Sequence, residues 1–254
     1  MAQSILDLEP PKADRRVHYG SGEFHYADVR MPQGKGPFAV VMNIHGGFWR
    51  AAYDLVHAGH LCVGLTKAGL ATFNVEYRRV GNPGGTWPGT FEDIRNAYGY
   101  LQQNAAGLGF DPKRILVMGH SAGGQLALCL AAHEPGIRRV VSLAGVVDLQ
   151  RAFELHLSND AVVEFLQGTP QQVPEHYREA SPIMLKVAAS QVLIAGDKDD
   201  VVPPEMSRGY VSKKKREGEQ VKLVEIPKCD HFDLIDPSSE AFKTVVVEVK
   251  KLLA

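Results

Sequence analysis

The chain has 254 residues, of which 44% are hydrophobic and 22% are charged, and its formal net charge is -1. This length and composition suit one α/β domain with a sizeable core that needs no disulfide or metal to hold it. A nearly neutral chain gives no electrostatic reason to expect nucleic acid or an anionic membrane as a partner. We therefore expect the partner to be a small molecule.

The cysteines are few and widely separated, at positions 62, 129 and 229. An odd count without a C-x-x-C pair argues for reduced thiols, and so for the cytoplasm. The first 16 residues lack a basic segment followed by an apolar one, and no apolar run approaches the ~18 residues of a membrane span. No His, Asp or Glu cluster has metal-ligand spacing, and no Gly-rich loop resembles a nucleotide fingerprint, so we expect neither a metal nor a cofactor.

The chain begins with a predicted arm over residues 1–14, which contains Pro10-Pro11. Two alternating segments, 16–19 and 24–30, flank Gly20-Ser21-Gly22 and predict a β-hairpin. The apolar run 38–44 predicts a strand that is covered on both faces.

Strands and helices then alternate. From their apolar spacing we predict strands at 70–77, 114–118, 139–144, 191–195 and 221–226, and helices at 55–68, 91–103, 125–132 and 204–216. A closing helix is predicted with Asp236 as N-cap and Pro237 at its first position. This order predicts an α/β fold with a mostly parallel twisted sheet, an N-terminal antiparallel hairpin and helices on both faces.

One long segment interrupts the alternation. Residues 149–186 have sparse apolar positions and three prolines, and a loop of that length in a compact domain usually has a function. We predict that it is a small helical lid inserted in a single domain that spans residues 1–254.

The sequence Gly119-His120-Ser121-Ala122-Gly123 follows an apolar strand and precedes a helix. A Gly-x-Ser-x-Gly turn of this kind strains the serine backbone, and its glycines allow a close approach that a side chain would prevent. The turn would expose Ser121 at the strand end, next to the free N–H groups of the helix N-terminus. Ser121 is therefore the candidate nucleophile.

A serine nucleophile needs a base and an acid that orients the base. His231 is the only histidine after the last predicted strand, and we assign it as the base. The acid should follow an earlier strand, where Asp197, Asp199 and Asp200 share one loop and Asp148 follows the strand before.

The second motif is His45-Gly46-Gly47-Phe48-Trp49, immediately after the strand 38–44. Its backbone N–H groups, from Gly46, Gly47 and Phe48, would hold an oxyanion together with the N–H of Ala122. We expect His45 to make a structural hydrogen bond. Phe48 and Trp49 fit either the core or the pocket wall, and Trp49 is the candidate substrate contact.

These motifs resemble the α/β-hydrolase superfamily, in its esterase and lipase branch, over roughly residues 20–254. The resemblance rests on 45–49, 119–124, 196–203 and His231-Phe232, and it extends to 74–78 and 87–93, which are structural in that branch. Gly196-x-x-Asp199-x-x-Val202 resembles the acid turn of these enzymes, so the resemblance selects Asp199, and the chain order Ser, Asp, His then matches theirs.

One departure concerns the substrate. Lipases of the H-G-G-G type have a third glycine where this chain has Phe48, and H-G-G-x-W is similar to kynurenine formamidases. The resemblance implies a serine hydrolase that cleaves small carboxylic esters through an acyl-enzyme without a cofactor. The alternatives are an arylformamidase, a carbohydrate acetyl esterase and a non-catalytic ligand-binding relative. The sequence does not indicate the oligomeric state.

Overall fold

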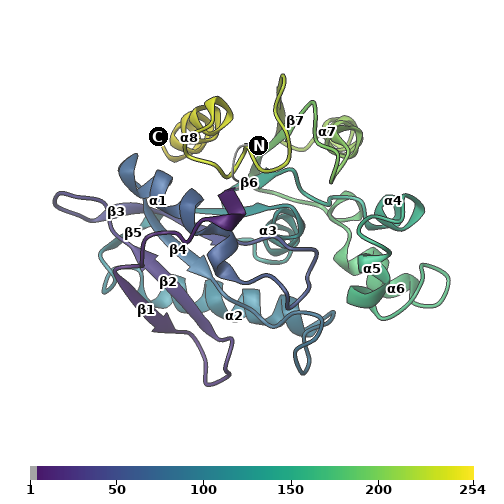
Figure 1. The fold of residues 1–254 in the computed structure, drawn as a ribbon, viewed down its shortest axis with the longest axis horizontal. Coiled ribbons are helices and arrows are strands. Elements are labelled where there is room, and N and C mark those ends of the chain that lie inside the picture. The colour runs from purple at the N-terminus through teal and green to yellow at the C-terminus, as the bar shows by residue number, and fades with distance from the viewer. Residues whose placement is uncertain (1–4) are drawn as a thin grey trace.

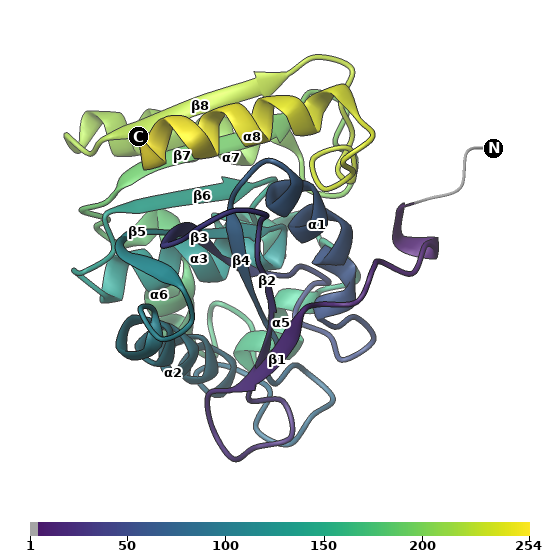
Figure 2. The same ribbon diagram turned by 90° about the vertical axis from the view of Figure 1, so that its left-hand side faces the viewer.

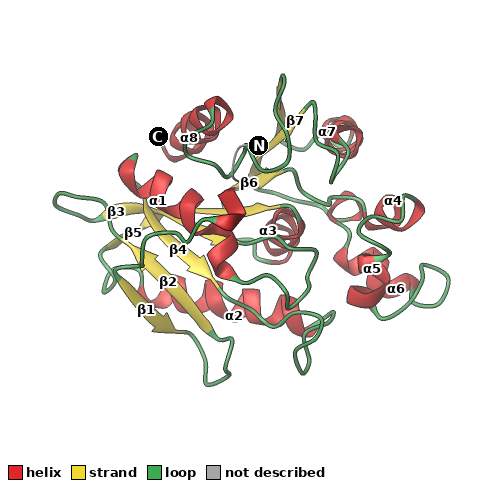
Figure 3. Cartoon of the chain, in the orientation of Figure 1, coloured by secondary structure: helices red, strands yellow, loops and turns green. Residues whose placement is uncertain are grey.

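The computed structural model describes residues 5–254, and within this range the chain forms one eight-stranded sheet with helices on both faces (Figure 1, Figure 3). The spatial order of its strands is β1-β2-β4-β3-β5-β6-β7-β8. The strand β2 is antiparallel to β1 and β4, and all the other neighbours are parallel. This confirms the predicted mostly parallel sheet with an N-terminal antiparallel hairpin.

The strands are β1 (Arg15–His18), β2 (Tyr26–Arg30), β3 (Phe38–Ile44), β4 (Ala71–Val75), β5 (Phe110–His120), β6 (Arg139–Leu143), β7 (Ser190–Gly196) and β8 (Val221–Ile226). The α-helices are α1 (Gly59–Lys67), α2 (Gly89–Asn104), α3 (Ala122–His133), α4 (Leu149–Glu154), α5 (Ala161–Leu166), α6 (Pro174–Ala180), α7 (Pro204–Arg216) and α8 (Glu240–Leu253). Short 3₁₀ helices are η1 (Ile5–Asp7), η2 (Leu55–Ala58) and η3 (Pro182–Met184).

The core consists of two apolar layers, one on each face of the sheet. Successive residues of a strand point to opposite faces, so Val40 and Met42 of β3 join one layer while Val41 joins the other. The first layer packs under α2 and α3, and the second under α1 and α8. Figure 2 shows α8 beside β7 and β8, with β1 at the opposite edge of the sheet.

The predicted bounds of β3, α7 and β8 match the structure, and other bounds needed correction. The segment 55–68 was predicted as one helix but is divided, because Asp54 caps η2 and α1 begins only at Gly59. The strand β5 is longer than predicted, since pairing with β3 extends it back to Phe110. The strand β4 is shorter, because its register with β2 and β3 runs only from Ala71 to Val75.

The predicted start of the last helix was wrong. The side chain of Ser239 accepts the N–H of Phe242 and caps α8, so the helix begins at Glu240. The carboxylate of Asp236 instead accepts from the N–H and the hydroxyl of Ser238, and this local turn holds Pro237 outside the helix.

The segment 149–186 is helical, as predicted, and contributes α4, α5, α6 and η3 at one side of the molecule (Figure 1). Its apolar side chains, among them Phe165, Leu166 and Tyr177, belong to the same core layer as α2 and α3. Its role as a lid stays a prediction. The first four residues of the predicted N-terminal arm lie outside the described residues, and the following part packs through Pro10 against Gly59.

Candidate active site

The turn of the candidate nucleophile Ser121 lies between β5 and α3. Ser121 has φ 57° and ψ -122°, a left-handed conformation that is costly for a residue with a side chain. Its N–H donates to the carbonyl of Leu143 at 2.8 Å, which ties the turn to β6. A Cβ on Gly119 would lie 2.1 Å from the oxygen of Gly123, and one on Gly123 would lie 2.0 Å from that of Ile44. Both glycines are therefore sterically required.

Asp199 and His231 meet in the buried interior of the site. The Nδ1 of His231 lies 2.7 Å from Oδ2 of Asp199, and the two side chains are 3% and 0% exposed. The other oxygen, Oδ1, accepts the N–H groups of Val201 and Val202 at 3.0 and 2.8 Å. Because an ionised carboxylate only accepts hydrogen bonds, Nδ1 carries the proton and Nε2 can act as a base.

The loops of Asp199 and His231 are joined by backbone N–H groups as well. Lys198 donates its backbone N–H to the carbonyl of Cys229 at 2.9 Å, and Lys228 donates its backbone N–H to the carboxylate of Asp197 at 2.6 Å. Asp148 lies elsewhere, where its carboxylate accepts the N–H of Arg151 and caps α4. Of the competing aspartates, the structure thus brings Asp199 to the histidine.

The glycine loop after β3 lies against the serine. A Cβ on Gly46 would be 3.0 Å from the Cβ of Ser121. Gly47 and Phe48 have φ of 105° and 47°, which turns their peptide planes away from a strand geometry. Within residues 5–254 the N–H groups of Gly47, Phe48 and Ala122 have no acceptor, so all three remain available to a ligand oxygen.

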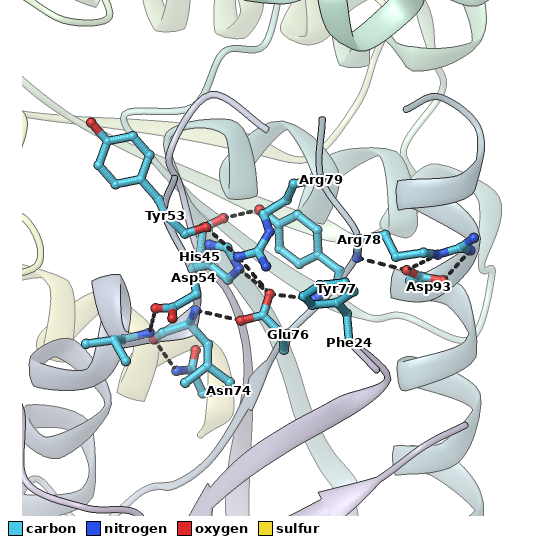
Figure 4. A network of polar contacts seen from close by, with 12 residues as sticks. Phe24, His45, Tyr53, Asp54, Asn74, Glu76, Tyr77, Arg78, Arg79 and Asp93 are labelled. Atoms are coloured by element: carbon cyan, nitrogen blue, oxygen red, sulfur yellow. Dashed lines mark hydrogen bonds and ion pairs between the residues drawn. The ribbon is translucent and has the colours of Figure 1, made fainter. Parts of the chain in front are cut away.

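A buried polar network contacts the start of this loop at His45 (Figure 4). Its centre is the fully buried Glu76, which forms an ion pair with Arg79 at 2.9 Å and accepts hydrogen bonds from His45 and from the N–H groups of Tyr77 and Leu55 at 2.9 to 3.3 Å. Burial alone would raise the pKa of Glu76, but the charge and hydrogen bond of His45, together with Arg79, outweigh it and lower that pKa. The carboxylate therefore stays ionised.

The network reaches the loop through His45 itself. Its Nδ1 lies 2.8 Å from the carbonyl of Gly46, its ring stacks on Tyr77 at 4.3 Å, and the hydroxyl of Tyr77 donates to its carbonyl at 2.8 Å. His45 makes structural hydrogen bonds, as expected. It orients the peptide groups that precede Gly47.

The chain matches the family model BD-FAE over residues 27–213, which is more than half of its length. The chain belongs to the BD-FAE family. The matched range includes Ser121 and Asp199, whereas His231 lies beyond it.

The BD-FAE chain is also similar to individual proteins. It is 26% identical to the probable carboxylic ester hydrolase LipM of Mycobacterium tuberculosis over 92% of this chain. It is 25% identical to a kynurenine formamidase of Salmo salar, over 93% of this chain and 77% of that protein. It spans 60% of LipM and 50% of the esterase LipQ from the same bacterium, to which it is 28% identical over 77% of this chain.

A solved structure described as a truncated carbohydrate esterase from gut microbiota superposes with a TM-score of 0.82 at 23% identity. The superposition covers 96% of this chain and 99% of that one. It confirms the α/β-hydrolase fold for this BD-FAE chain.

The two aromatic residues of the glycine loop differ in their surroundings. Trp49 is 1% exposed, its Nε1 donates to Gln125 at 2.9 Å, and its ring stacks on Phe165 of α5 at 4.6 Å. Phe48 is half-buried. These contacts favour the core alternative for Trp49, while its assignment as a substrate contact stays a prediction.

Two residues of this site were not identified from the sequence. Glu76 lies in the stretch 74–78 that resembles the esterase branch, so the sequence did contain a signal there. That signal did not indicate that Glu76 is the centre of a buried network. His57 carried no signal, because nothing in its local sequence distinguishes it from the other histidines of the chain. In the structure it contacts His120 of the nucleophile turn.

Within residues 5–254, no group of three or more His, Cys, Asp or Glu side chains could hold a metal ion. Over the same range, every helix is too short or too polar to cross a membrane.

Proposed function

We propose that this BD-FAE protein is a serine hydrolase of small carboxylic esters, with Ser121 as nucleophile, His231 as base and Asp199 as the orienting acid. The observation that carries the proposal is the buried 2.7 Å contact between His231 and Asp199. The loop of His231 also contacts the turn of Ser121, since Nε2 of His120 lies 2.9 Å from the carbonyl of His231, and Ser121 itself has a strained positive φ. The names of LipM and LipQ, both ester hydrolases, support the same reaction class.

In the proposed reaction the Oγ of Ser121 attacks the ester carbonyl while Nε2 of His231 takes its proton. The carbonyl oxygen becomes an oxyanion, which the N–H groups of Ala122 and of Gly46, Gly47 or Phe48 stabilise. Of these, the N–H groups of Gly47, Phe48 and Ala122 have no acceptor in the described chain, which supports the role. Losing one such donor typically costs about 3 kcal/mol of transition-state stabilisation.

The tetrahedral intermediate then breaks its bond to the leaving alcohol, which departs with the proton from His231. Water attacks the acyl-Ser121 in the same geometry and gives a proton to His231; the acyl–Oγ bond then breaks, His231 returns that proton to Oγ of Ser121, and the carboxylic acid is released. The carboxylate of Asp199 stabilises the imidazolium at each step and keeps the proton of Nδ1 in place. No group outside the chain takes part apart from substrate and water.

An arylformamidase is the second candidate. It is supported by the H-G-G-F-W sequence and by the similarity to the Salmo salar kynurenine formamidase. A carbohydrate acetyl esterase is a third candidate, since the solved carbohydrate esterase has the same fold. All three reactions use the same triad, and they differ in the substrate that must bind beside it.

Replacing Ser121 tests the nucleophile. Ser121→Ala should reduce hydrolysis of p-nitrophenyl acetate to the rate in buffer and abolish labelling by a fluorophosphonate probe. Ser142→Ala is the matched control, because Ser142 is buried on the neighbouring strand β6 and should leave both readouts unchanged. Labelling that persists in a folded Ser121→Ala protein would contradict the proposal.

A substrate panel separates the three candidates. We expect kcat/KM for acetyl and butyryl esters of p-nitrophenol to exceed that for N-formylkynurenine and for acetylated xylan. A clear preference for the formamide would replace the esterase proposal by the arylformamidase, and a preference for the acetylated polysaccharide would favour the third candidate.

A further inference from the structure

His120, the residue before the nucleophile, joins two parts of the site that are far apart in the sequence. Its side chain is fully buried, and its Nε2 lies 2.9 Å from the backbone carbonyl oxygen of His231. Its Nδ1 lies 3.2 Å from Nε2 of His57, which belongs to η2. The rings of His120 and His231 are 4.5 Å apart between centroids, and those of His57 and His120 are 5.4 Å apart. The three histidines form a continuous row.

The chemistry of these contacts determines where the protons lie. A carbonyl oxygen only accepts hydrogen bonds, so Nε2 of His120 must carry the proton. In a neutral imidazole, Nδ1 of His120 is then an acceptor, and Nε2 of His57 must be its donor. This leaves Nδ1 of His57 without a proton, and that atom is buried and has no hydrogen-bond partner within residues 5–254. The two donors therefore point in one direction, toward His231.

The surroundings keep both rings neutral. Burial, followed by the positive charges that His45 and His231 can carry, lowers the pKa of His57 to about 3. Burial also holds the pKa of His120 well below its usual value, with His231 and His57 as further causes, although the bond to the carbonyl of His231 opposes the shift. Among the polar groups near this row, Tyr53 lies beside His57, His45 acts on His57 through its charge, and Asp199 lies beside His231.

We propose that His57 and His120 form a neutral hydrogen-bond relay, from His57 to His120 to the backbone carbonyl of His231, which positions the catalytic base against Ser121. The proposal rests on the proposed function, because it assigns a positioning role for that reaction. His57 and His120 are positioning residues, since they act through His231.

The relay supplies a restraint that the acid cannot. Asp199 holds the ring of His231 through Nδ1, whereas His120 holds the backbone of the same residue. Because His120 is covalently next to Ser121, the relay links base and nucleophile through one buried hydrogen bond. A displacement of about 1 Å in such a pair can cost about 100-fold in rate, so the link matters for turnover more than for binding.

The kinetic test uses p-nitrophenyl acetate and the full chain. His120→Leu should lower kcat about 100-fold while KM changes less than about two-fold, and His120→Gln, whose amide can donate to the same carbonyl, should recover most of the loss. His57→Leu should lower kcat by a smaller factor, and His57→Gln should resemble the wild type. His60→Leu is the control, because His60 also contacts a backbone carbonyl, that of Leu8, but away from the site.

The second test measures the tautomers directly and does not depend on activity. In ¹⁵N-resolved NMR of the wild-type protein, His57 and His120 should both be neutral with the proton on Nε2 from pH 5 to 8. A proton on Nδ1 of His120, or titration of either ring near pH 6.5, would overturn the relay. Wild-type kcat in a folded His120→Leu protein would overturn its positioning role, and if that variant does not fold, wild-type kcat in His57→Leu would do so. A wild-type protein that neither hydrolyses esters nor reacts with a fluorophosphonate would instead refute the proposed function.

Discussion

Asp199 differs from the other aspartates of its loop in what its two oxygens contact. One oxygen binds His231, and the other accepts two backbone N–H groups. The carboxylate of Asp197 is turned to the N–H of Lys228, and Asp200 is exposed. At the residue scale the carboxylate of Asp199 is thus fixed in position by three hydrogen bonds, as an orienting acid requires.

Exchanging this carboxylate for an amide should reverse the tautomer of the base. Asn at position 199 offers an N–H group to Nδ1 of His231, which favours the proton on Nε2, where a base cannot use it. We expect Asp199→Asn to lower kcat by about 10⁴-fold, as the same change does in serine proteases. Asp148→Asn should keep kcat and its helix cap, because Asn caps as well as Asp. Steady-state kinetics that rank the two variants in the opposite order would make Asp148 the acid.

His57 also makes a prediction about stability. In the unfolded chain the pKa of His57 is about 6.5, whereas in the folded chain burial lowers this pKa to about 3. Between these values the unfolded state holds more protons, so the free energy of unfolding decreases as the pH falls, by up to about 1.4 kcal/mol per pH unit for one such group. His57→Gln should therefore show a shallower decrease between pH 6 and 4 in urea unfolding. Parallel pH profiles for variant and wild type would contradict this.

At the scale of elements, the glycine loop after β3 is held by side chains from elements that are distant in the sequence. Glu76 follows β4 and binds the ring of His45 after β3 and the N–H of Leu55 in η2. The neighbouring Arg78 pairs with the buried Asp93 of α2 at 2.6 Å, and Arg79 donates to the carbonyl of Tyr53 (Figure 4). The short segment 76–79 after β4 thus contacts the glycine loop, η2 and α2 and fixes their positions relative to one another.

Neutralising the centre of this network should be costly. Glu76→Gln leaves His45 and Arg79 buried without a counter-charge, and breaking a buried pair in this way typically costs about 3 to 5 kcal/mol. We expect urea unfolding to show a loss of about 3 kcal/mol, and kcat to fall because the loop loosens. Glu134→Gln, which breaks the exposed pair with Arg95, should cost under about 1 kcal/mol. Equal losses in the two variants would rule out a central role for Glu76.

For the whole molecule, the question is whether residues 149–186 unfold with the sheet. Trp49 stacks on Phe165 of this segment, and Trp87 donates its backbone N–H to the carbonyl of Phe165 at 2.9 Å. The amide of Gln125 in α3 donates to the carbonyl of Ala180 at 2.7 Å. The segment therefore shares the core layer of α2 and α3, and we propose that it belongs to one cooperative domain.

Tryptophan fluorescence can test whether the segment detaches before the sheet unfolds. The chain has only two tryptophans, Trp49 and Trp87, and the rings of both contact Phe165 of the segment. In urea, tryptophan fluorescence should report this contact while far-ultraviolet circular dichroism reports the whole fold. We expect the two transitions to coincide, as for a single cooperative unit. A fluorescence change at lower urea than the loss of helix would indicate a segment that detaches first, as a mobile lid does.

The sequence by itself determined the features that depend on neighbouring residues. Apolar period and turn residues located the strands and helices, including the full bounds of β3, α7 and β8. The glycines around Ser121 indicated its strained turn, because the steric need for glycine is local. Where two local signals competed, as at Asp236 and Ser239, the sequence selected the wrong helix start.

Only the tertiary structure decided which distant side chains meet. Asp148 and Asp199 both follow strands, and the contact of Asp199 with His231 depends on how the loops after β7 and β8 pack together. The same holds for the contact of Glu76 with His45 of the glycine loop and for that of His57 with His120. Such pairs form because the sheet order places separate loops at one edge, and that order arises from the packing of two core layers over the whole chain.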